Sequence, residues 1–172
     1  DVVKYVGRLN LDQGVFTNGF LIDRYHNQLL DNFTYVRISL DAGSEKIHSE
    51  LHDVPMHHFK KIIENLELLI KKRKNNSPTI GVQYATHQRN FDDLKNCAKI
   101  CKDIGVDYLS VKPVFDRGSV HEKIEKNTLT KLQIDDEVKN IRELENANFK
   151  IFFREHQFES ENLGYNVLSY DR

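Results

Sequence analysis

The chain alternates short apolar runs with longer amphipathic segments. The short runs are rich in β-branched or aromatic residues and lie between polar or turn-forming residues, a pattern typical of strands. The predicted strands cover residues 14–17, 35–40, 79–84, 108–113 and 149–153. The longer segments carry apolar residues at steps of three and four, which predicts helices with one buried face. Because strands and helices alternate, the pattern favours parallel strands joined by crossover helices.

Several of the predicted helices have recognisable ends. The clearest apolar stripe covers residues 59–70. Asn90 and the acidic residues after it predict an N-cap for a helix over residues 91–104, which Gly105 ends in a left-handed C-cap. Thr130 is predicted to cap a further helix. Additional helices are expected over residues 2–6 and 22–30.

The composition is that of one folded domain covering residues 1–172. With 39% hydrophobic and 30% charged residues, the chain has enough apolar side chains to build a core. We expect βα units over about residues 1–155, with a long loop at 116–127, and an irregular tail at 156–172. The chain begins with Asp1 rather than with an initiator methionine, and its only methionine is Met56, so we also expect it to be a piece of a longer protein.

Charge and hydropathy limit the expected partners. The 25 Lys and Arg residues nearly balance 26 Asp and Glu residues, so no general positive field attracts nucleic acid, and nucleic acid is not expected as the main partner. The basic run at residues 71–74 is interpreted as a solvated helix end. No apolar run approaches the roughly 20 residues of a membrane span. Two cysteines without a signal peptide are compatible with a reducing cytoplasm.

Two clusters of metal-ligand residue types have simpler interpretations. Cys97 and Cys101 lie four residues apart on the apolar face of a predicted helix, which predicts core packing. His48 and His52 have the spacing of a helical metal pair, but the chain has no His-Glu-x-x-His motif there. Solvent-facing loop histidines are therefore the preferred interpretation.

Polar residues follow the predicted strands. In parallel α/β proteins, ligands gather at the carboxyl ends of the strands, because the loops leaving those ends form one rim. The rim candidates are Thr17, Asn18, Gly19, Ser39, Asp41, Gly43, Tyr84, Thr86, His87, Lys112, Pro113, Arg154 and Glu155. Loop residues of these types also form turns without any ligand, so both interpretations stay open.

Four segments in order resemble the core of radical SAM enzymes, a partial (β/α) TIM-type barrel with parallel strands and outer helices. The segments are GVFTNG at residues 14–19, YVRISLDAGS at 35–44, residues 79–90 and residues 105–113. They cover about residues 1–113. The final Tyr170-Asp171-Arg172 resembles the point where many members continue into a SPASM-type extension.

The resemblance implies a site for S-adenosylmethionine at the rim. It implies that Thr17, Asn18 and Ser39 contact the amino-acid or ribose part of this cofactor, with Asp41 at the same rim. Gln83 occupies the strand that helps to hold the cofactor, and Lys112 lies on the strand near the adenine. The chain has Gly81 where some relatives place a lysine, so the partner of the cofactor's carboxylate stays open.

The chain departs from the family at the iron–sulfur site. The Cys-x-x-x-Cys-x-x-Cys loop that binds the 4Fe–4S cluster is missing, so this fragment is not expected to bind the cluster itself. The resemblance implies a parent enzyme that carries the cluster and receives electrons from a donor. In that parent, a 5′-deoxyadenosyl radical abstracts hydrogen from a small-molecule or peptide substrate.

Two alternatives remain open from the sequence. One is a non-catalytic α/β module that binds a ligand or a protein and has lost the cluster loop. The other is an aldolase-like partial barrel in which Lys112 forms a Schiff base with a carbonyl substrate.

Overall fold

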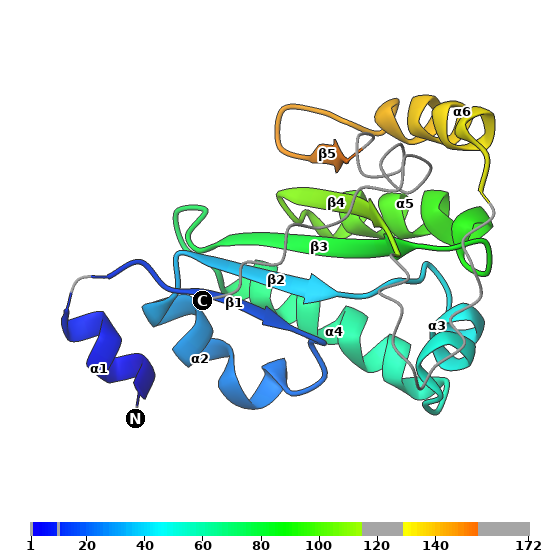
Figure 1. The fold of residues 1–172 in the computed structure, drawn as a ribbon. Helices are drawn as coiled ribbons and strands as arrows, with labels where there is room; N and C mark the ends of the chain where they lie inside the picture. The colour runs from blue at the N-terminus through cyan, green and yellow to red at the C-terminus, as the bar shows by residue number, and fades with distance from the viewer. Residues whose placement is uncertain (1, 10, 115–128, 155–172) are drawn as a thin grey trace, which may run out of the picture.

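The computed structural model describes residues 2–9, 11–114 and 129–154 (Figure 1). Within these ranges, strands and helices alternate along most of the chain. The elements are α1 (Val2–Arg8), β1 (Gly14–Thr17), α2 (Ile22–Asn32), β2 (Tyr35–Ser39), α3 (Glu45–His52), α4 (His57–Lys72), β3 (Thr79–Thr86), the 3-10 turn η1 (Phe91–Asp93), α5 (Leu94–Ile104), β4 (Tyr108–Pro113), α6 (Lys131–Arg142) and β5 (Lys150–Phe153). All five predicted strands are present, with small differences at their ends.

The strands form one parallel sheet in the order β1-β2-β3-β4-β5. Each pair of consecutive strands is therefore joined by a crossover, and right-handed crossovers in a sequential sheet place their helices on one face. Figure 1 shows α2 and α4 together along one side of the sheet. The predicted α/β architecture of parallel strands with outer helices is confirmed.

The two faces of the sheet differ in chemistry. Side chains alternate along a strand, and one set, including Ile38, Val82 and Val111, is fully buried under the helices. The other set lies on what we call the inner face, opposite the helices, and includes Arg37 and Gln83. The alternation therefore separates a structural face from one that carries polar side chains.

The core fills the space between sheet and helices. Leu66 and Leu69 of α4 are completely buried, as the apolar stripe predicted. Cys97 and Cys101 of α5 are also completely buried in the same cluster, which confirms core packing for both thiols. A second cluster joins Phe91 to α6.

The structure corrects three local predictions. Asn90 does not cap the next helix with its side chain, and the 3-10 turn η1 precedes α5. The segment around His48 is a helix, α3, which Ser44 caps. Arg73, predicted as part of a solvated helix end, is nearly buried and forms an ion pair with Asp107. In each case, a contact far away in the sequence or a missed helix overrides the local signal.

Two other predicted helix ends are confirmed. Gly105 ends α5 with a φ of 87°, in the left-handed region that glycine adopts without strain. Thr130 and Gln133 form a capping box at the start of α6. The predicted loop at 116–127 and the tail at 156–172 lie outside the described residues. Among the described helices, none is long and apolar enough to cross a membrane.

Candidate functional site

Four of the six predicted cofactor-binding residues gather at the carboxyl edge of the inner face. Ser39 and Gln83 are register partners on β2 and β3. Asp41 follows β2, and its Oδ1 accepts a hydrogen bond of 2.7 Å from the N–H of Ala85. Ala85 is in turn the register partner of Lys112 on β4. Three adjacent strands thus bring one hydroxyl, one carboxylate, one amide and one ammonium group to the same edge.

The other two predicted residues shape the turn after β1. Thr17 lies on the same strand face as Val15, which packs against the core, and its Oγ1 accepts a hydrogen bond from the N–H of Gly19 at 3.2 Å. The structure therefore does not bring its side chain together with the four on the inner face. Asn18 Oδ1 accepts from the N–H of Phe20 at 3.1 Å, an Asx turn.

Asn65 fixes this turn from beneath. Its buried side chain, on α4, donates to the carbonyl oxygens of Gly19 and Phe20 at 2.8 and 3.0 Å. Sequence analysis did not select Asn65. The available signal was its place within the apolar stripe of the helix, because a polar residue among buried positions needs a partner.

Asp41 is the most unusual residue of the edge. Its backbone has a φ of 57°, a left-handed conformation that aspartate tolerates better than most residues. Burial raises the pKa of its carboxyl group, whereas the Ala85 N–H and the nearby charges of His52 and Lys112 act in the opposite direction. A carboxylate with such a desolvation cost gains most from a cationic ligand.

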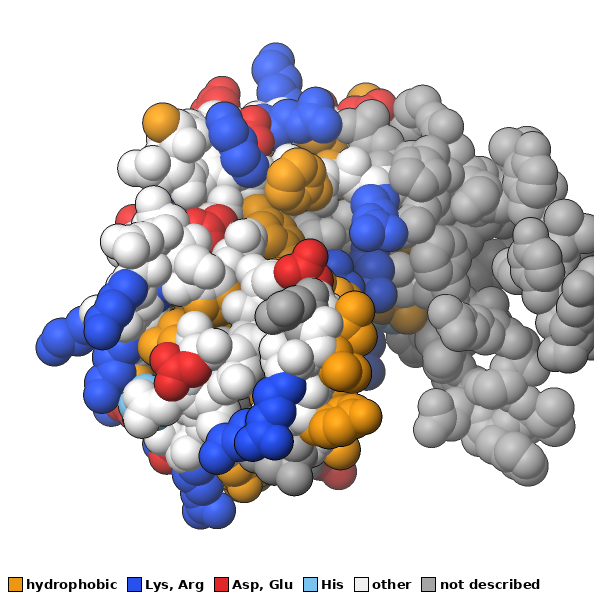
Figure 2. Space-filling model, turned by 90° about the vertical axis from the view of Figure 1, so that its left-hand side faces the viewer, with side chains coloured by type: hydrophobic (Ala, Val, Ile, Leu, Met, Phe, Trp, Pro, Cys, Tyr) orange, Lys and Arg blue, Asp and Glu red, His pale blue; other side chains and the backbone are white. Residues whose placement is uncertain are grey.

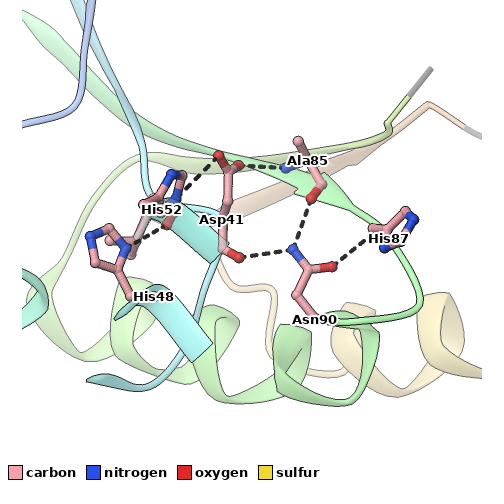
Figure 3. Close-up of polar contacts among 7 residues, drawn as sticks. Asp41, His48, His52, Ala85, His87 and Asn90 are labelled. Atoms are coloured by element: carbon pink, nitrogen blue, oxygen red, sulfur yellow. Dashed lines mark hydrogen bonds and ion pairs between the residues drawn. The ribbon is translucent and has the colours of Figure 1, made fainter. Parts of the chain in front are cut away.

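Asn90 holds the loops around Asp41 in place (Figure 3). Its Nδ2 donates to the carbonyl oxygens of Asp41 and Ala85 at 2.8 and 2.9 Å. Its Oδ1 accepts from the N–H of His87 at 2.7 Å. Its carbonyl oxygen accepts from the hydroxyl of Tyr84 at 2.6 Å. The amide that sequence analysis assigned to helix capping therefore joins the loop after β2 to the end of β3.

Two histidines of α3 extend this network in Figure 3. His48 is only 5% exposed, so its interpretation as a solvent-facing loop histidine is wrong. Its Nδ1–H donates to the carbonyl of Leu40 at 3.2 Å, and burial lowers its pKa. The His52 ring lies 4.6 Å from that of His48, and its Nε2 is 3.9 Å from Asp41 Oδ2.

The next segment of the β2–α3 loop is pressed against α5. Asp93 Oδ2 accepts from the N–H of Gly43 at 2.7 Å and from the Ser44 hydroxyl at 2.9 Å. A Cβ atom on Gly43 would lie 2.4 Å from the backbone nitrogen of Cys97. Gly43 is thus required for a close approach of two backbones, which explains it without any ligand.

The thiols do not fit an iron–sulfur cluster. Cluster ligands are thiolates, whereas Cys97 and Cys101 lie in the apolar core with their sulfurs 4.0 Å apart. The neighbouring Cys101 and burial both raise the pKa of Cys97. In the part of the chain that the structure describes, no group of three or more His, Cys, Asp or Glu side chains could hold a metal ion.

Comparison with known proteins gives matches in structure only. No family model and no curated protein matches the chain. A domain of pyruvate-formate lyase-activating enzyme from Bacteroides vulgatus superposes with a TM-score of 0.67 at 13% identity, over 89% of this chain and 87% of that one. The likeness is one of fold. It confirms the predicted partial (β/α) barrel.

SuiB from Streptococcus suis shares this fold. Its structure bound to S-adenosylmethionine gives a TM-score of 0.67 at 13% identity and covers 89% of this chain. Its structure bound to the precursor peptide SuiA gives a TM-score of 0.67 at 16% identity and covers 87% of this chain. The chain spans about a third of SuiB, 34% in both structures.

Proposed function

We propose that this chain is the portion of a radical SAM enzyme core that binds S-adenosylmethionine and the substrate. The observation that carries the proposal is the group formed by Ser39, Asp41, Gln83 and Lys112 at the carboxyl edge of a partial barrel. The ligand of SuiB, a protein of similar fold, supports this choice of cofactor.

The residues at this edge match the functional groups of the cofactor. S-adenosylmethionine carries an ammonium, a sulfonium, a carboxylate and ribose hydroxyls. Asp41 offers a carboxylate to the ammonium, and Lys112 offers an ammonium to the carboxylate. Ser39 and Gln83 supply hydrogen-bonding groups for the ribose hydroxyls. When bound, the cofactor supplies the radical that abstracts hydrogen, and these residues orient it.

The iron–sulfur cluster does not follow from the chain's own residues. Both of its cysteines are buried in the core, so they do not supply the cluster ligands. In this proposal, the cluster and the electron donor that serves it belong to a parent enzyme of which this chain is one part. For the substrate, the peptide-bound structure of SuiB favours a peptide over other small molecules. Reduced, unpaired thiols suit a cytoplasmic protein.

Calorimetric titration of the 172-residue chain with S-adenosylmethionine tests the proposal. Asp41→Asn keeps an acceptor for the Ala85 N–H and tolerates the left-handed backbone, but removes the negative charge. We expect it to weaken binding by about tenfold, the loss of one charge-assisted contact. Asp92→Asn is the matched control, because Asp92 is an exposed carboxylate on the 3-10 turn η1. No binding to the folded chain at millimolar cofactor would refute the proposal.

The buried cysteines favour one alternative, a non-catalytic module with the same fold. A folded chain that does not bind S-adenosylmethionine would support that alternative. The aldolase-like alternative is weaker. Asp41 is close enough to Lys112 for their charges to interact. A neighbouring carboxylate favours the charged ammonium, whereas a Schiff base needs the neutral amine.

A further inference from the structure

A cavity of about 530 Å³ lies at the β5 edge of the sheet, where residues of the inner face and of α6 both line it. Its lining includes Arg37, Tyr108, Ser110, Arg142, Phe152 and Arg154. Its volume is within the range of small-molecule sites. We infer that this cavity binds a ligand that carries a carboxylate next to an aromatic group. That this ligand is the substrate of the enzyme rests on the proposed function. Whether the cavity binds such a ligand is tested independently of that function.

Arg37 is oriented before any ligand arrives. Its guanidinium carbon lies 3.8 Å from the centre of the Phe16 ring, and it also contacts the hydroxyl of Tyr108. Gly81 lies between Arg37 and Tyr108 in the register, and a Cβ atom there would be 2.1 Å from the Tyr108 ring. The missing side chain at Gly81 therefore lets Arg37 and Tyr108 meet across β3.

The cavity has a clear electrostatic preference. Three arginines line it, and none of the described residues that line it is a carboxylate. Among the described residues, neither Arg37 nor Arg154 forms an ion pair with Asp or Glu. A guanidinium presents paired N–H donors that match the two oxygens of a carboxylate. We therefore expect the part of the cavity lined by the arginines to hold an anionic group of the ligand.

Ser110 adds a neutral polar group to the cavity. This residue is 5% exposed, and it lines the cavity. A serine hydroxyl can donate a hydrogen bond to a ligand oxygen there. The hydroxyl and the guanidinium groups thus favour the same kind of ligand atom.

Aromatic rings form the other part of the cavity. Tyr108 and Phe152 meet edge to face with their centroids 5.6 Å apart, and Phe152 is 56% exposed. An exposed ring beside an ordered one is a suitable seat for an aromatic ligand group. Figure 2, which looks at the end where the strands begin, shows basic and hydrophobic side chains next to one another at the right-hand margin of the described surface.

The cavity adjoins the proposed cofactor site. Gln83, Ser110 and Phe152 are register partners on three adjacent strands, so one row of the inner face links the two. Lys112 follows Ser110 by two positions on the same face of β4. A ligand held by the arginines would therefore lie beside the cofactor, as a substrate must.

The test is an NMR titration of the uniformly ¹⁵N-labelled 172-residue chain with three probes. N-acetylphenylalanine carries a ring and a free carboxylate, and the peptide acetyl-Phe-Glu-amide carries the carboxylate on a side chain. N-acetylphenylalaninamide is the neutral control. We expect one or both acids to shift the amide signals of Ser110 and Phe152. Tighter binding of N-acetylphenylalanine would indicate a small free acid as the ligand, and tighter binding of acetyl-Phe-Glu-amide would indicate an acidic peptide.

Arg154→Gln is the main variant, because this exposed side chain makes no contact that the fold needs. We expect it to weaken the binding of the acids by about tenfold, while the exposed control Arg24→Gln leaves their binding unchanged. Equal binding of the neutral amide, no binding of either acid, or equal affinities of the two variants would overturn the inference. A chain that binds an acid but not S-adenosylmethionine would refute the proposed function alone.

Discussion

Replacing Asn90 with alanine tests whether one side chain holds the carboxyl edge together. The change removes three hydrogen bonds, to the carbonyls of Asp41 and Ala85 and from the N–H of His87. At about 1 kcal/mol of net stability each, their loss lowers the free energy of unfolding by about 3 kcal/mol. For a chain of this size, 1 kcal/mol corresponds to about 2–4 °C, so Tm should fall by about 6–12 °C.

Thermal unfolding followed by circular dichroism measures this effect, with Asn96→Ala as the matched control. Asn96 is exposed and donates a single hydrogen bond, to Asp93 at 3.0 Å, so its replacement should change Tm little. Asn90→Asp should be at least as harmful as Asn90→Ala, because it keeps the acceptor for His87 but turns a carboxylate oxygen toward two carbonyls. If Asn90→Ala and Asn96→Ala unfold at the same temperature, the assigned role of Asn90 is wrong.

Three further predictions concern single side chains. Gly43→Ala should destabilise the fold by about 1–3 kcal/mol in urea unfolding, because the added methyl group meets the backbone of α5, whereas Gly7→Ala meets nothing closer than 3.5 Å and should not destabilise it. Asn65→Ala should cost about 2 kcal/mol for two lost hydrogen bonds by the same assay, and Glu64→Ala, on the exposed side of α4, should cost little. Burial raises the pKa of Asp41. The carboxyl group therefore stabilises the folded state in acid, and this contribution is lost as the pH rises through the folded-state pKa. The free energy of unfolding of Asp41→Asn, relative to that of the wild type, should therefore be higher at pH 7 than at pH 3. An equal difference at both pH values would contradict this.

The sequence predicts the strands well because their signal is local. A buried strand such as β3 needs a run of β-branched and aromatic residues, and turn-forming residues stand at its ends. The inner-face candidates follow from the same information. Once β2, β3 and β4 are parallel, Ser39, Gln83 and Lys112 must lie at one edge.

The contacts that hold the edge are not local, and the sequence does not predict them. Asp93 binds Gly43 across 50 positions, and Asn65 binds Gly19 across 46 positions. Asn90 has the residue type and position of an N-cap, but the carbonyl of Asp41, 49 positions away, accepts from its amide. Only the packed sheet decides which of these competing partners an amide finds, so local patterns cannot rank them.

The engaged backbone groups at the carboxyl edge have a consequence for binding thermodynamics. The N–H groups of Gly43, Ala85 and His87 donate to side chains of the chain itself, which fixes the loops around the edge during folding. A ligand of the proposed site would therefore meet a preorganised surface and lose little affinity to the entropy of ordering loops. Its selectivity would come from fixed shape and charge rather than from closure around the ligand.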